Sequence, residues 1–381
     1  MPIRILHVAS FTGNIGDNAN HAGFRPWFER LIDAAVEWTD FEIREVYRQS
    51  RRFDLDFANF ANGYDLLVVG GGNYFELWVE DSPTGTSFSI TDDALSKLDV
   101  PVFFNALGVD AGQGVPDVAR RRFQAFLGKI LARGDLVTVR NDGSWATLQA
   151  NAGSVDLTKV LQLPDAGFFA GYGSLQRPEH HPPIIGINLA GDMLETRFPN
   201  GTLGYRAFLT ELAAFMTNAL QRWPDLTFVM FPHIFRDLRV FVDLLEILPD
   251  NIRRGHCRVA AYDTGDRAAS EIFTAYAGCD LVLGMRFHAN VVPIGQGVPV
   301  AGLVCYSQVE LLYQELLASD RAVDVRKPGF SRGLAALAEQ ALQTPRVAEE
   351  TIEKLRDQAY RLRAEAEQPV RDWFVGRVIQ H

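Results

Sequence analysis

The 381-residue chain is poor in cysteine, has no block rich in lysine or arginine, and contains no long apolar run. Its three cysteines, Cys257, Cys279 and Cys305, lack metal-ligand spacing, so we expect buried thiols rather than a disulfide framework. A formal net charge of -10 argues against a sequence-reading nucleic-acid binder or a strongly basic membrane-surface protein. No apolar run reaches about 18 residues, so no spanning helix is expected, and the start MPIRILHVAS predicts a strand rather than a signal peptide.

Short apolar runs alternate with amphipathic segments along most of the chain. Helical periodicity marks 21–37 and 117–133, and a Gly- and Pro-rich stretch at 171–183 interrupts the pattern before it resumes with IIGINLA. From about residue 331 the chain is helical, including a long charged helix at 346–366. The first half has the following predicted strands: RILHVAS, FEIREVY, DLLVVGGG, PVFFNALGV, DLVTVR and VLQLPDAGFF.

This alternation predicts an α/β protein. Strands separated by helices of ten or more residues are joined by right-handed crossovers and form parallel sheets covered on both faces. We therefore expect two doubly wound, Rossmann-like domains that face a cleft. The predicted boundaries are an N-terminal domain at 1–175, a linker at 176–183, a C-terminal domain at 184–330, and helices at 331–381 that pack back across the domains. Ligands of such sheets bind at the carboxyl ends of the strands, where we look for a site.

The first candidate follows the first strand, in SFTGNIGDNAN. Asn14, Gly16 and Asp17 lie at a strand-to-helix turn, where backbone amides and the helix dipole favour an anion. The alternative is an ordinary turn in which Asp17 or Asn18 caps the helix.

The second candidate follows the strand LLVV. Gly71, Gly72 and Asn73 belong to a run in which consecutive glycines cost backbone entropy, unless the backbone must approach a ligand or another segment closely. A bulge or a tight strand exit is the alternative.

Two further candidates lie in the second half. His233 follows Pro232 at a strand end, although a lone histidine is also compatible with a structural role. In GMRFH, Arg286 presents a permanent planar cation and His288 an imidazole that titrates near neutral pH, at the start of a helix. Cation, imidazole and helix amides together indicate an anion site with an acid beside it; the rival interpretation is a buried structural ion pair.

Taken together, five segments resemble the polysaccharide pyruvyl transferase family. They are GNIGDN, VVGGGN, VRNDGSW, LPDAGF and GMRFHANVVPIGQGVPVAGLVCYS, and the resemblance spans roughly residues 5–310. The Met-Arg-x-His motif with the downstream Gly-x-Pro and tyrosine is the most specific part. The resemblance implies a fold similar to that of the B-type glycosyltransferases.

The implied activity is transfer of a pyruvyl group from phosphoenolpyruvate to two hydroxyls of a sugar, which gives a cyclic ketal and phosphate. His288 and Asp17 would be the catalytic residues, and Asn14, Gly16, Asp17, Gly71, Gly72 and Asn73 the acceptor-side loops. The resemblance, with the strand-end position of His233, places these residues at the donor site: Arg286, Phe287, His288, Ala289, Tyr306 and His233. Phosphoenolpyruvate would be a co-substrate, and we expect no further cofactor and no metal.

The sequence also departs from this family's pattern. Gln308 stands where many members have a lysine, and the strand ending near Asn188 lacks an arginine that many members have; Arg197 is nearby but out of register. A nucleotide-sugar glycosyltransferase and a non-catalytic sugar-binding relative therefore stay open as alternatives. The expected partner is a sugar or lipid-linked oligosaccharide acceptor, at a cytoplasmic location that includes the inner face of the membrane. The acceptor's identity and any homo-oligomer stay undetermined by sequence.

Overall fold

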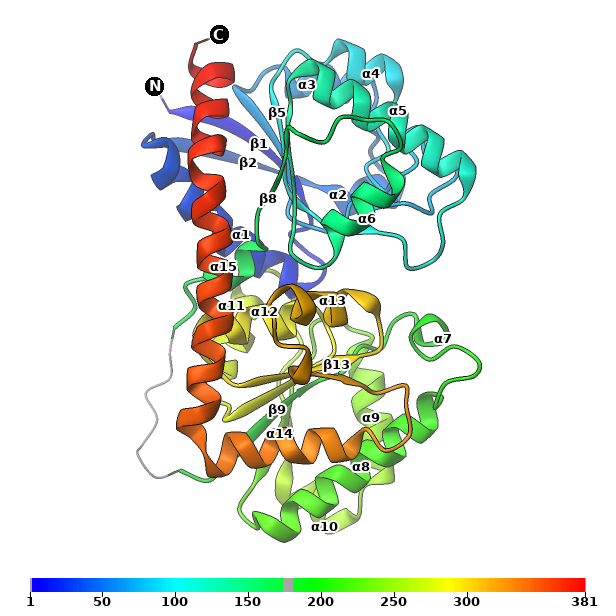
Figure 1. Ribbon diagram of the computed structural model, residues 1–381, viewed down its shortest axis with the longest axis vertical. Helices are drawn as coiled ribbons and strands as arrows, with labels where there is room; N and C mark the ends of the chain where they lie inside the picture. The colour runs from blue at the N-terminus through cyan, green and yellow to red at the C-terminus, as the bar shows by residue number, and fades with distance from the viewer. Residues whose placement is uncertain (1, 174–180, 381) are drawn as a thin grey trace. The chain divides into compact units, whose positions relative to one another are not determined.

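The computed structural model describes residues 2–173 and 181–380, which form two compact units (Figure 1). The N-terminal unit comprises Met1–Gly13, Asn20–Ala166 and Tyr360–His381, and the C-terminal unit comprises Asn14–Ala19 and Gly167–Ala359. Residues 176–180 of the expected linker lie outside the described residues.

The N-terminal unit is built on a six-stranded parallel sheet in the order β2-β1-β3-β5-β7-β8. The strands are β1 (Ile3–Ala9), β2 (Val36–Glu42), β3 (Leu66–Gly70), β5 (Val102–Leu107), β7 (Leu136–Val139) and β8 (Val160–Gln162). A small parallel ribbon pairs β4 (Phe75–Glu76) with β6 (Val109–Asp110). The helices are α1 (Ile15–Ile32), α2 (Ile43–Tyr47), α3 (Leu55–Ala61), α4 (Asp92–Lys97), α5 (Asp117–Arg133) and α6 (Ser144–Asn151), and η1 (Ala166–Phe169) is a 3₁₀ turn.

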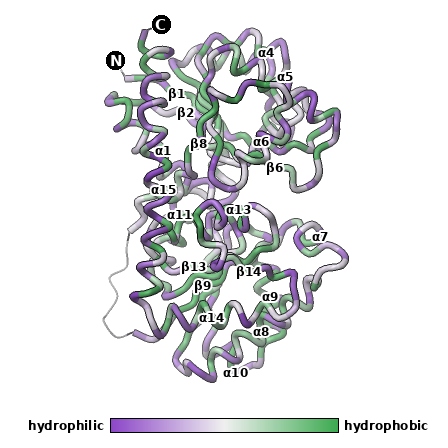
Figure 2. Tube along the Cα trace, in the orientation of Figure 1, coloured by the Kyte–Doolittle hydropathy of each residue, from purple (hydrophilic) through white to green (hydrophobic). Residues whose placement is uncertain are grey.

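Helices cover both faces of this sheet because its central strands are apolar at successive positions. In β5, Phe103 packs against Phe24 and Phe28 of α1, with ring centroids 5.9 and 5.8 Å away. The next residue, Phe104, points to the other face and meets Phe126 of α5 at 6.0 Å. This alternation follows from the two-residue period of a strand, and the hydrophobic strands are visible in Figure 2.

The C-terminal unit repeats the design with the order β11-β10-β9-β12-β13-β14, all parallel. The strands are β9 (Ile184–Asn188), β10 (Thr227–Met230), β11 (Cys257–Val259), β12 (Leu281–Gly284), β13 (Val300–Val304) and β14 (Ala322–Asp324). Its helices are α7 (Leu194–Arg197), α8 (Tyr205–Arg222), α9 (Asp237–Ile247), α10 (Asp250–His256), α11 (Gly265–Tyr276), α12 (His288–Gln296), α13 (Ser307–Glu315) and α14 (Ser331–Gln343), with the short 3₁₀ turn η2 (Ser319–Arg321). Helix α15 (Pro345–Phe374) belongs to this unit up to Ala359 and to the N-terminal unit from Tyr360, and the π-helix η3 (Val375–Ile379) belongs to the N-terminal unit.

Both sheets have a topological switch point. The chain adds strands on one side of β1 and then crosses to β3, and it does the same around β9 before crossing to β12. The predicted doubly wound architecture is therefore confirmed. Ligand sites of such sheets lie outside the carboxyl ends of the strands at the switch point.

Two elements start or end elsewhere than the sequence predicted. The segment FEIREVY is not one strand: β2 ends at Glu42 and the remaining residues form α2, because the Glu42 side chain accepts the Arg44 amide and caps that helix. The helix expected at 21–37 is α1, which begins at Ile15 because the Asn14 side chain accepts the Gly16 amide at 3.0 Å.

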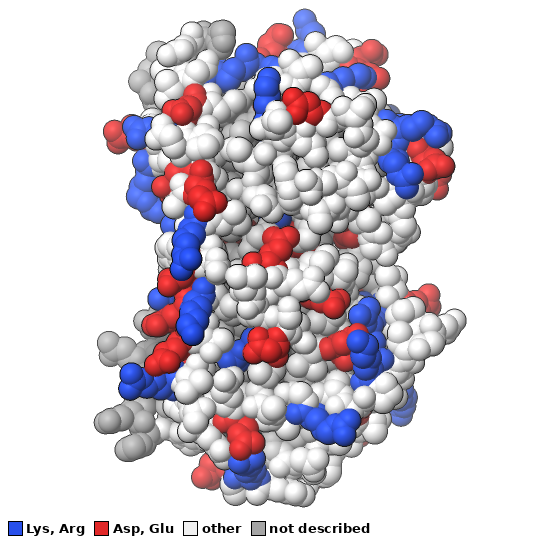
Figure 3. Space-filling view, viewed as in Figure 1, with Lys and Arg blue, Asp and Glu red and all other residues white. Residues whose placement is uncertain are grey.

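The two units divide the chain differently from the expected domains: residues 167–173, expected in the first domain, group with the C-terminal unit. Asn14–Ala19, expected in the first domain, packs in the C-terminal unit, whereas Tyr360–His381 packs in the N-terminal unit. The long helix α15 carries a buried stripe whose first members, Ile352 and Leu355, join the core of the C-terminal unit. Later members, Val370 and Phe374, join the core of the N-terminal unit. Its other faces carry the interspersed acidic and basic side chains that Figure 3 shows along this helix.

Candidate functional site

The candidate site of the C-terminal unit lies at its switch point, where β9 and β12 end side by side. Gly284 ends β12, and a Cβ there would overlap the carbonyl oxygen of Ala289. This close approach lets the chain turn into α12 within three residues. Arg286 and His288 therefore emerge at the carboxyl edge of the sheet, as the sequence predicted.

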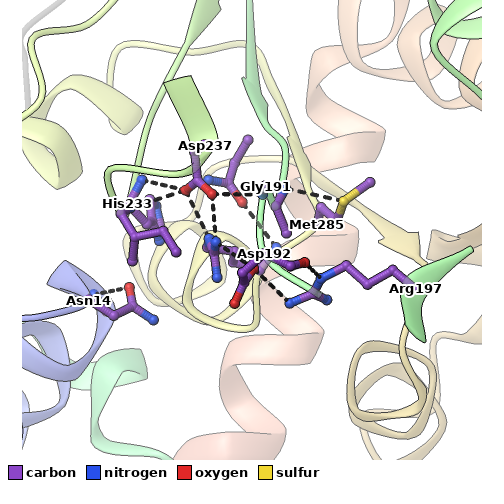
Figure 4. Close-up of polar contacts among 12 residues, drawn as sticks. Asn14, Gly191, Asp192, Arg197, His233, Asp237 and Met285 are labelled. Carbon is purple, nitrogen blue, oxygen red and sulfur yellow. Dashed lines mark hydrogen bonds and ion pairs between the residues drawn. The ribbon is translucent and has the colours of Figure 1, made fainter. Parts of the chain in front are cut away.

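Arg286 is paired at this edge with the buried carboxylate of Asp237, which is labelled in Figure 4. Its Nε donates to Asp237 Oδ2 at 2.9 Å and its Nη2 to Asp237 Oδ1 at 2.5 Å, in a bidentate pair. Asp237 is fully buried at the start of α9, and only 8% of Arg286 is exposed. Burial alone would lower the pKa of Arg286, but Asp237 and Asp192 raise it above its ordinary value. A buried ion pair was the rival interpretation of Arg286 from the sequence, but the sequence did not identify Asp237 and Asp192 as its partners.

The backbone around Asp237 is organised by the same carboxylate. Oδ1 accepts the amide of Gly191 at 2.9 Å, while Oδ2 accepts the amides of His233 and Ile234 at 2.9 and 3.1 Å. One side chain thus connects the loops that follow β9 and β10 to the loop that follows β12. Sequence reasoning assigned no role to Asp237, although a carboxylate in the first turn of a helix after a strand is a recognisable capping signal.

A second carboxylate, Asp192, joins two guanidinium groups. Its Oδ1 accepts Nη2 of Arg286 at 2.8 Å and Nη2 of Arg197 at 3.2 Å. Burial alone would raise the pKa of Asp192, but the two arginines lower it below its ordinary value. Arg197 is out of register in the sequence, but its position at the end of α7 brings its guanidinium to this site. Its Nη1 also lies 3.6 Å from Cys305 Sγ, and its guanidinium lies 5.9 Å from the centre of the Tyr306 ring.

His288 is the first residue of α12 and only 5% of it is exposed. Gly16 packs directly on the imidazole, because a Cβ at residue 16 would overlap Nδ1 of His288. The amide of Ile15 donates to the carbonyl oxygen of His233 at 3.4 Å. The loop that contains Asn14 and Asp17 thus meets the strand ends of the C-terminal unit, and the structure brings three of the four candidate segments together. Asp17 is partly exposed in the first turn of α1.

His233 is fully buried, and its Nε2 lies 2.8 Å from the hydroxyl of Tyr276. Burial, reinforced by the charges of Arg286 and His288, lowers the pKa of His233 well below its ordinary value. The imidazole is therefore neutral near pH 7 and offers no positive charge to an anion. Phe287, another predicted donor residue, packs edge-to-face on His288 with ring centroids 5.4 Å apart.

The amides at the start of α12 differ from our expectation. We predicted that backbone amides near 288–290 would bind an anion. Instead, the amide of Ala289 donates to the carbonyl of Arg286, and the amide of Asn290 to that of Phe287, both at 3.0 Å. Phe287 already has helical φ and ψ, so the first turn closes on itself and these two donors are used internally.

The remaining candidate segment, the glycine run at 71–73, lies in the N-terminal unit at the end of β3. A Cβ on Gly71 would overlap the Asn20 side chain, and one on Gly72 would overlap the Tyr74 ring. These glycines therefore permit a tight strand exit against neighbouring side chains, which was the alternative to a ligand loop. Asn73 donates to Asp110 Oδ2 at 2.9 Å.

Sequence reasoning missed Glu76 beside this segment. Burial, with a contribution from Asp110, raises the pKa of Glu76 to about 7, against hydrogen bonds from Ser87 and Asn73 that lower it. A carboxyl group that titrates near neutrality can exchange protons at working pH. The sequence gives no sign of this environment, because Glu76 comes opposite Asp110 only through the pairing of β4 with β6.

An open groove adjoins the Asp192 loop. Its volume is about 750 Å³, and it is lined by the 191–196 loop and by residues of α9 and the turn before it, among them Phe235, Arg236 and Arg239. Asp192 therefore has the two arginines on one side and this groove on another.

The model of the polysaccharide pyruvyl transferase family matches residues 7–306, which include every candidate segment. The chain belongs to the polysaccharide pyruvyl transferase family. The resemblance seen in the five motifs is thereby confirmed, and membership of this family supports a transferase that modifies polysaccharides. A comparison with curated protein sequences gave no significant match.

Solved structures place this pyruvyl transferase family member among proteins of the B-type glycosyltransferase fold. A glycosyltransferase from Rickettsia africae ESF-5 has a TM-score of 0.59 at 11% identity, covering 100% of this chain and 99% of its own. HepE of Anabaena, solved with UDP and glucose, has a TM-score of 0.54 at 12% identity, covering 97% and 100%. UDP-GlcNAc 2-epimerase from Neisseria meningitidis, bound to UDP-GlcNAc, has a TM-score of 0.53 at 12% identity, covering 97% and 100%. At these identities the likeness concerns the fold alone.

Two features are absent from the described part of this family member. Residues 2–173 and 181–380 contain no group of three or more His, Cys, Asp or Glu side chains that could hold a metal ion. Among the same residues, no helix has both the length and the apolar character needed to cross a bilayer. The three cysteines are buried free thiols, as predicted.

Proposed function

We propose that the protein transfers the pyruvyl group of phosphoenolpyruvate to two hydroxyls of a sugar, on a cell-surface polysaccharide or its precursor. The observation that carries the proposal is the coincidence of two facts. The family match spans residues 7–306, and within it Arg286 and His288 lie at the switch-point edge of the C-terminal sheet. That edge is where doubly wound sheets bind their ligands.

The chemistry requires a group that donates a proton, a group that accepts one, and a cationic site that binds phosphoenolpyruvate. Protonation of the methylene carbon of phosphoenolpyruvate makes its C2 cation-like, and a sugar hydroxyl then forms a bond to C2 and loses its proton. Departure of phosphate breaks the old C2–O bond, and a second hydroxyl then forms a bond to C2 and loses its proton, which closes the ketal. His288 is the proposed general acid or phosphate partner, and Asp17 is the proposed base.

The surroundings of His288 support its assignment. It lies close enough to His233 to interact with it electrostatically, and Gly16 packs on its imidazole, where a Cβ would overlap Nδ1. General acid catalysis contributes about 10²–10⁴-fold to a rate. We therefore expect His288→Ala to lower turnover by at least about 100-fold. His256→Ala, a histidine of the same unit at the end of α10, serves as the matched control and should leave turnover unchanged.

The assay is acceptor-dependent release of inorganic phosphate from phosphoenolpyruvate, with the ketal detected by mass spectrometry of the sugar. Candidate acceptors are free, lipid-linked and polymeric hexoses and N-acetylhexosamines. Thermal stabilisation by phosphoenolpyruvate is measured beside that by UDP-sugars. Stabilisation by a UDP-sugar with release of a nucleoside diphosphate would replace the proposal with a glycosyltransferase. Saccharide binding with no phosphate release from any acceptor would indicate a non-catalytic relative.

A further inference from the structure

Two arginines of the C-terminal unit converge on one carboxylate oxygen. Oδ1 of Asp192 accepts Nη2 of Arg286 at 2.8 Å and Nη2 of Arg197 at 3.2 Å (Figure 4). Side-chain exposures are 8% for Arg286, 12% for Arg197 and 22% for Asp192. A single anionic oxygen held between two largely desolvated guanidiniums is the arrangement by which proteins bind phosphate and carboxylate ligands.

The two carboxylates at this edge differ in how firmly they are held. Asp237 is fully buried and accepts backbone amides as well as Arg286, so it cannot leave without exposing several donors. The Asp192 carboxylate is held by the two arginines and by its own backbone amide, and it is the more exposed of the two carboxylates. Asp192 is therefore the anion that can be exchanged. When the Asp192 carboxylate moves away, the two positive arginines and the one negative Asp237 that stay at this edge have a net charge of plus one.

The loop provides room for that movement without a backbone change. Three contacts fix the backbone: the Ala190 amide lies 3.2 Å from Met285 Sδ, the Gly191 amide donates to Asp237, and the Asp192 carbonyl accepts Nε of Arg197 at 2.9 Å. Asp192 also lines the groove of about 750 Å³. Rotation about its side-chain bonds would carry the carboxylate into that groove, whose walls include Arg236 and Arg239.

We infer that the carboxylate of Asp192 occupies the place of a ligand anion, and that a phosphate monoester bearing a carboxylate displaces it and is held by Nη2 of Arg197 and of Arg286. The inference rests on the proposed function in taking phosphoenolpyruvate as that ligand. It assigns a donor-binding role to Arg197, which the sequence placed out of register, and makes Asp192 a competitor for the donor.

The test is isothermal titration of phosphoenolpyruvate, and separately of inorganic phosphate, into wild type and variants. Asp192→Asn removes the competing charge, so Kd for phosphoenolpyruvate should fall by about tenfold, the effect of one charge-assisted hydrogen bond. Arg197→Gln should raise Kd by about tenfold or more. Glu339→Gln is the matched control: it removes a carboxylate from an exposed arginine pair of the same unit, with Arg222, and should leave Kd unchanged. Asp192→Ser is a second neutral variant, so the test can be carried out if only one of Asp192→Asn and Asp192→Ser folds.

The outcomes separate the two proposals. If phosphoenolpyruvate binds wild type and both neutral variants with equal affinity, the displacement of Asp192 is wrong while the proposed function stands. If phosphoenolpyruvate binds none of them, but inorganic phosphate binds the neutral variants more tightly than wild type, the arginine site stands and the proposed donor is wrong. Absence of binding by either anion to any variant overturns both.

Discussion

The pair formed by Asp237 and Arg286 should determine the stability of the C-terminal unit, and Asp237→Asn tests this. The carboxylate accepts three backbone amides and two guanidinium donors, all within 3.1 Å. The substitution preserves shape but removes the charge, and it turns an amide NH₂ group toward some of these donors. Arg286 then stays buried, and Asp192 is the charged carboxylate that still pairs with it.

Removing one partner of a buried ion pair costs about 3–5 kcal/mol, because the other charge is left without compensation. By contrast, an exposed pair is worth about 0–1 kcal/mol. The matched comparison is Glu339→Gln, whose partner Arg222 is 47% exposed. We therefore expect Asp237→Asn to lower the free energy of unfolding of this unit by several times the effect of Glu339→Gln.

Urea unfolding followed by far-UV circular dichroism gives the overall change, and hydrogen exchange of peptides from 184–330 localises it to the C-terminal unit. A third variant, Arg286→Met in the Asp237→Asn background, removes the orphaned charge and should recover part of the loss. Equal unfolding midpoints for Asp237→Asn and Glu339→Gln would refute the reasoning, since the pair would then contribute no more than a surface contact.

Three further predictions follow from the site geometry. Gly16→Ala forces a methyl group onto His288, so turnover and melting temperature should both fall. Gly255→Ala, with no atom within 4 Å of its Cβ, should leave turnover unchanged and should not lower the melting temperature, because alanine is favoured over glycine in a helix. Equal behaviour of the two variants would contradict the packing. Burial raises the pKa of Glu76 from 4.5 to about 7, so its contribution to the free energy of unfolding is complete below pH 4.5 and is lost as pH rises through 7. Glu76→Gln should abolish that fall in a pH series. The pKa of His233 is lowered by burial, so stability is lost as pH falls below 6.5, by at most about 1.4 kcal/mol per pH unit, and His233→Gln should flatten this slope.

The fold was predictable because its determinants are local. A strand buried on both faces reads as a continuous apolar run, and a helix reads as a 3.6-residue period, so the alternation alone implied two parallel sheets. The errors lie where one side chain decides a boundary. Glu42 caps α2 and shortens the expected strand, and Asn14 starts α1 before the expected residue.

The site was predictable only in part. Strand ends pointed to Arg286 and His288, but the partners of Arg286 lie 49 and 94 positions away, and no spacing rule links residues at such separations. Asp192 and Asp237 become neighbours only once β9, β10 and β12 are ordered side by side. The expected helix amides failed for a local reason, since the backbone of Phe287 is already helical.

The shared helix α15 has a consequence for synthesis of the protein. Phe28 and Phe103 are translated well before Phe374, whose ring lies 5.7 Å from that of Phe28. Between Ala166 and Phe374 the ribosome adds roughly 200 residues, which takes roughly 10–40 s at about 5–20 residues per second. For that interval the nascent first sheet exposes aromatic surface, so chaperones that recognise such surface have time to engage it.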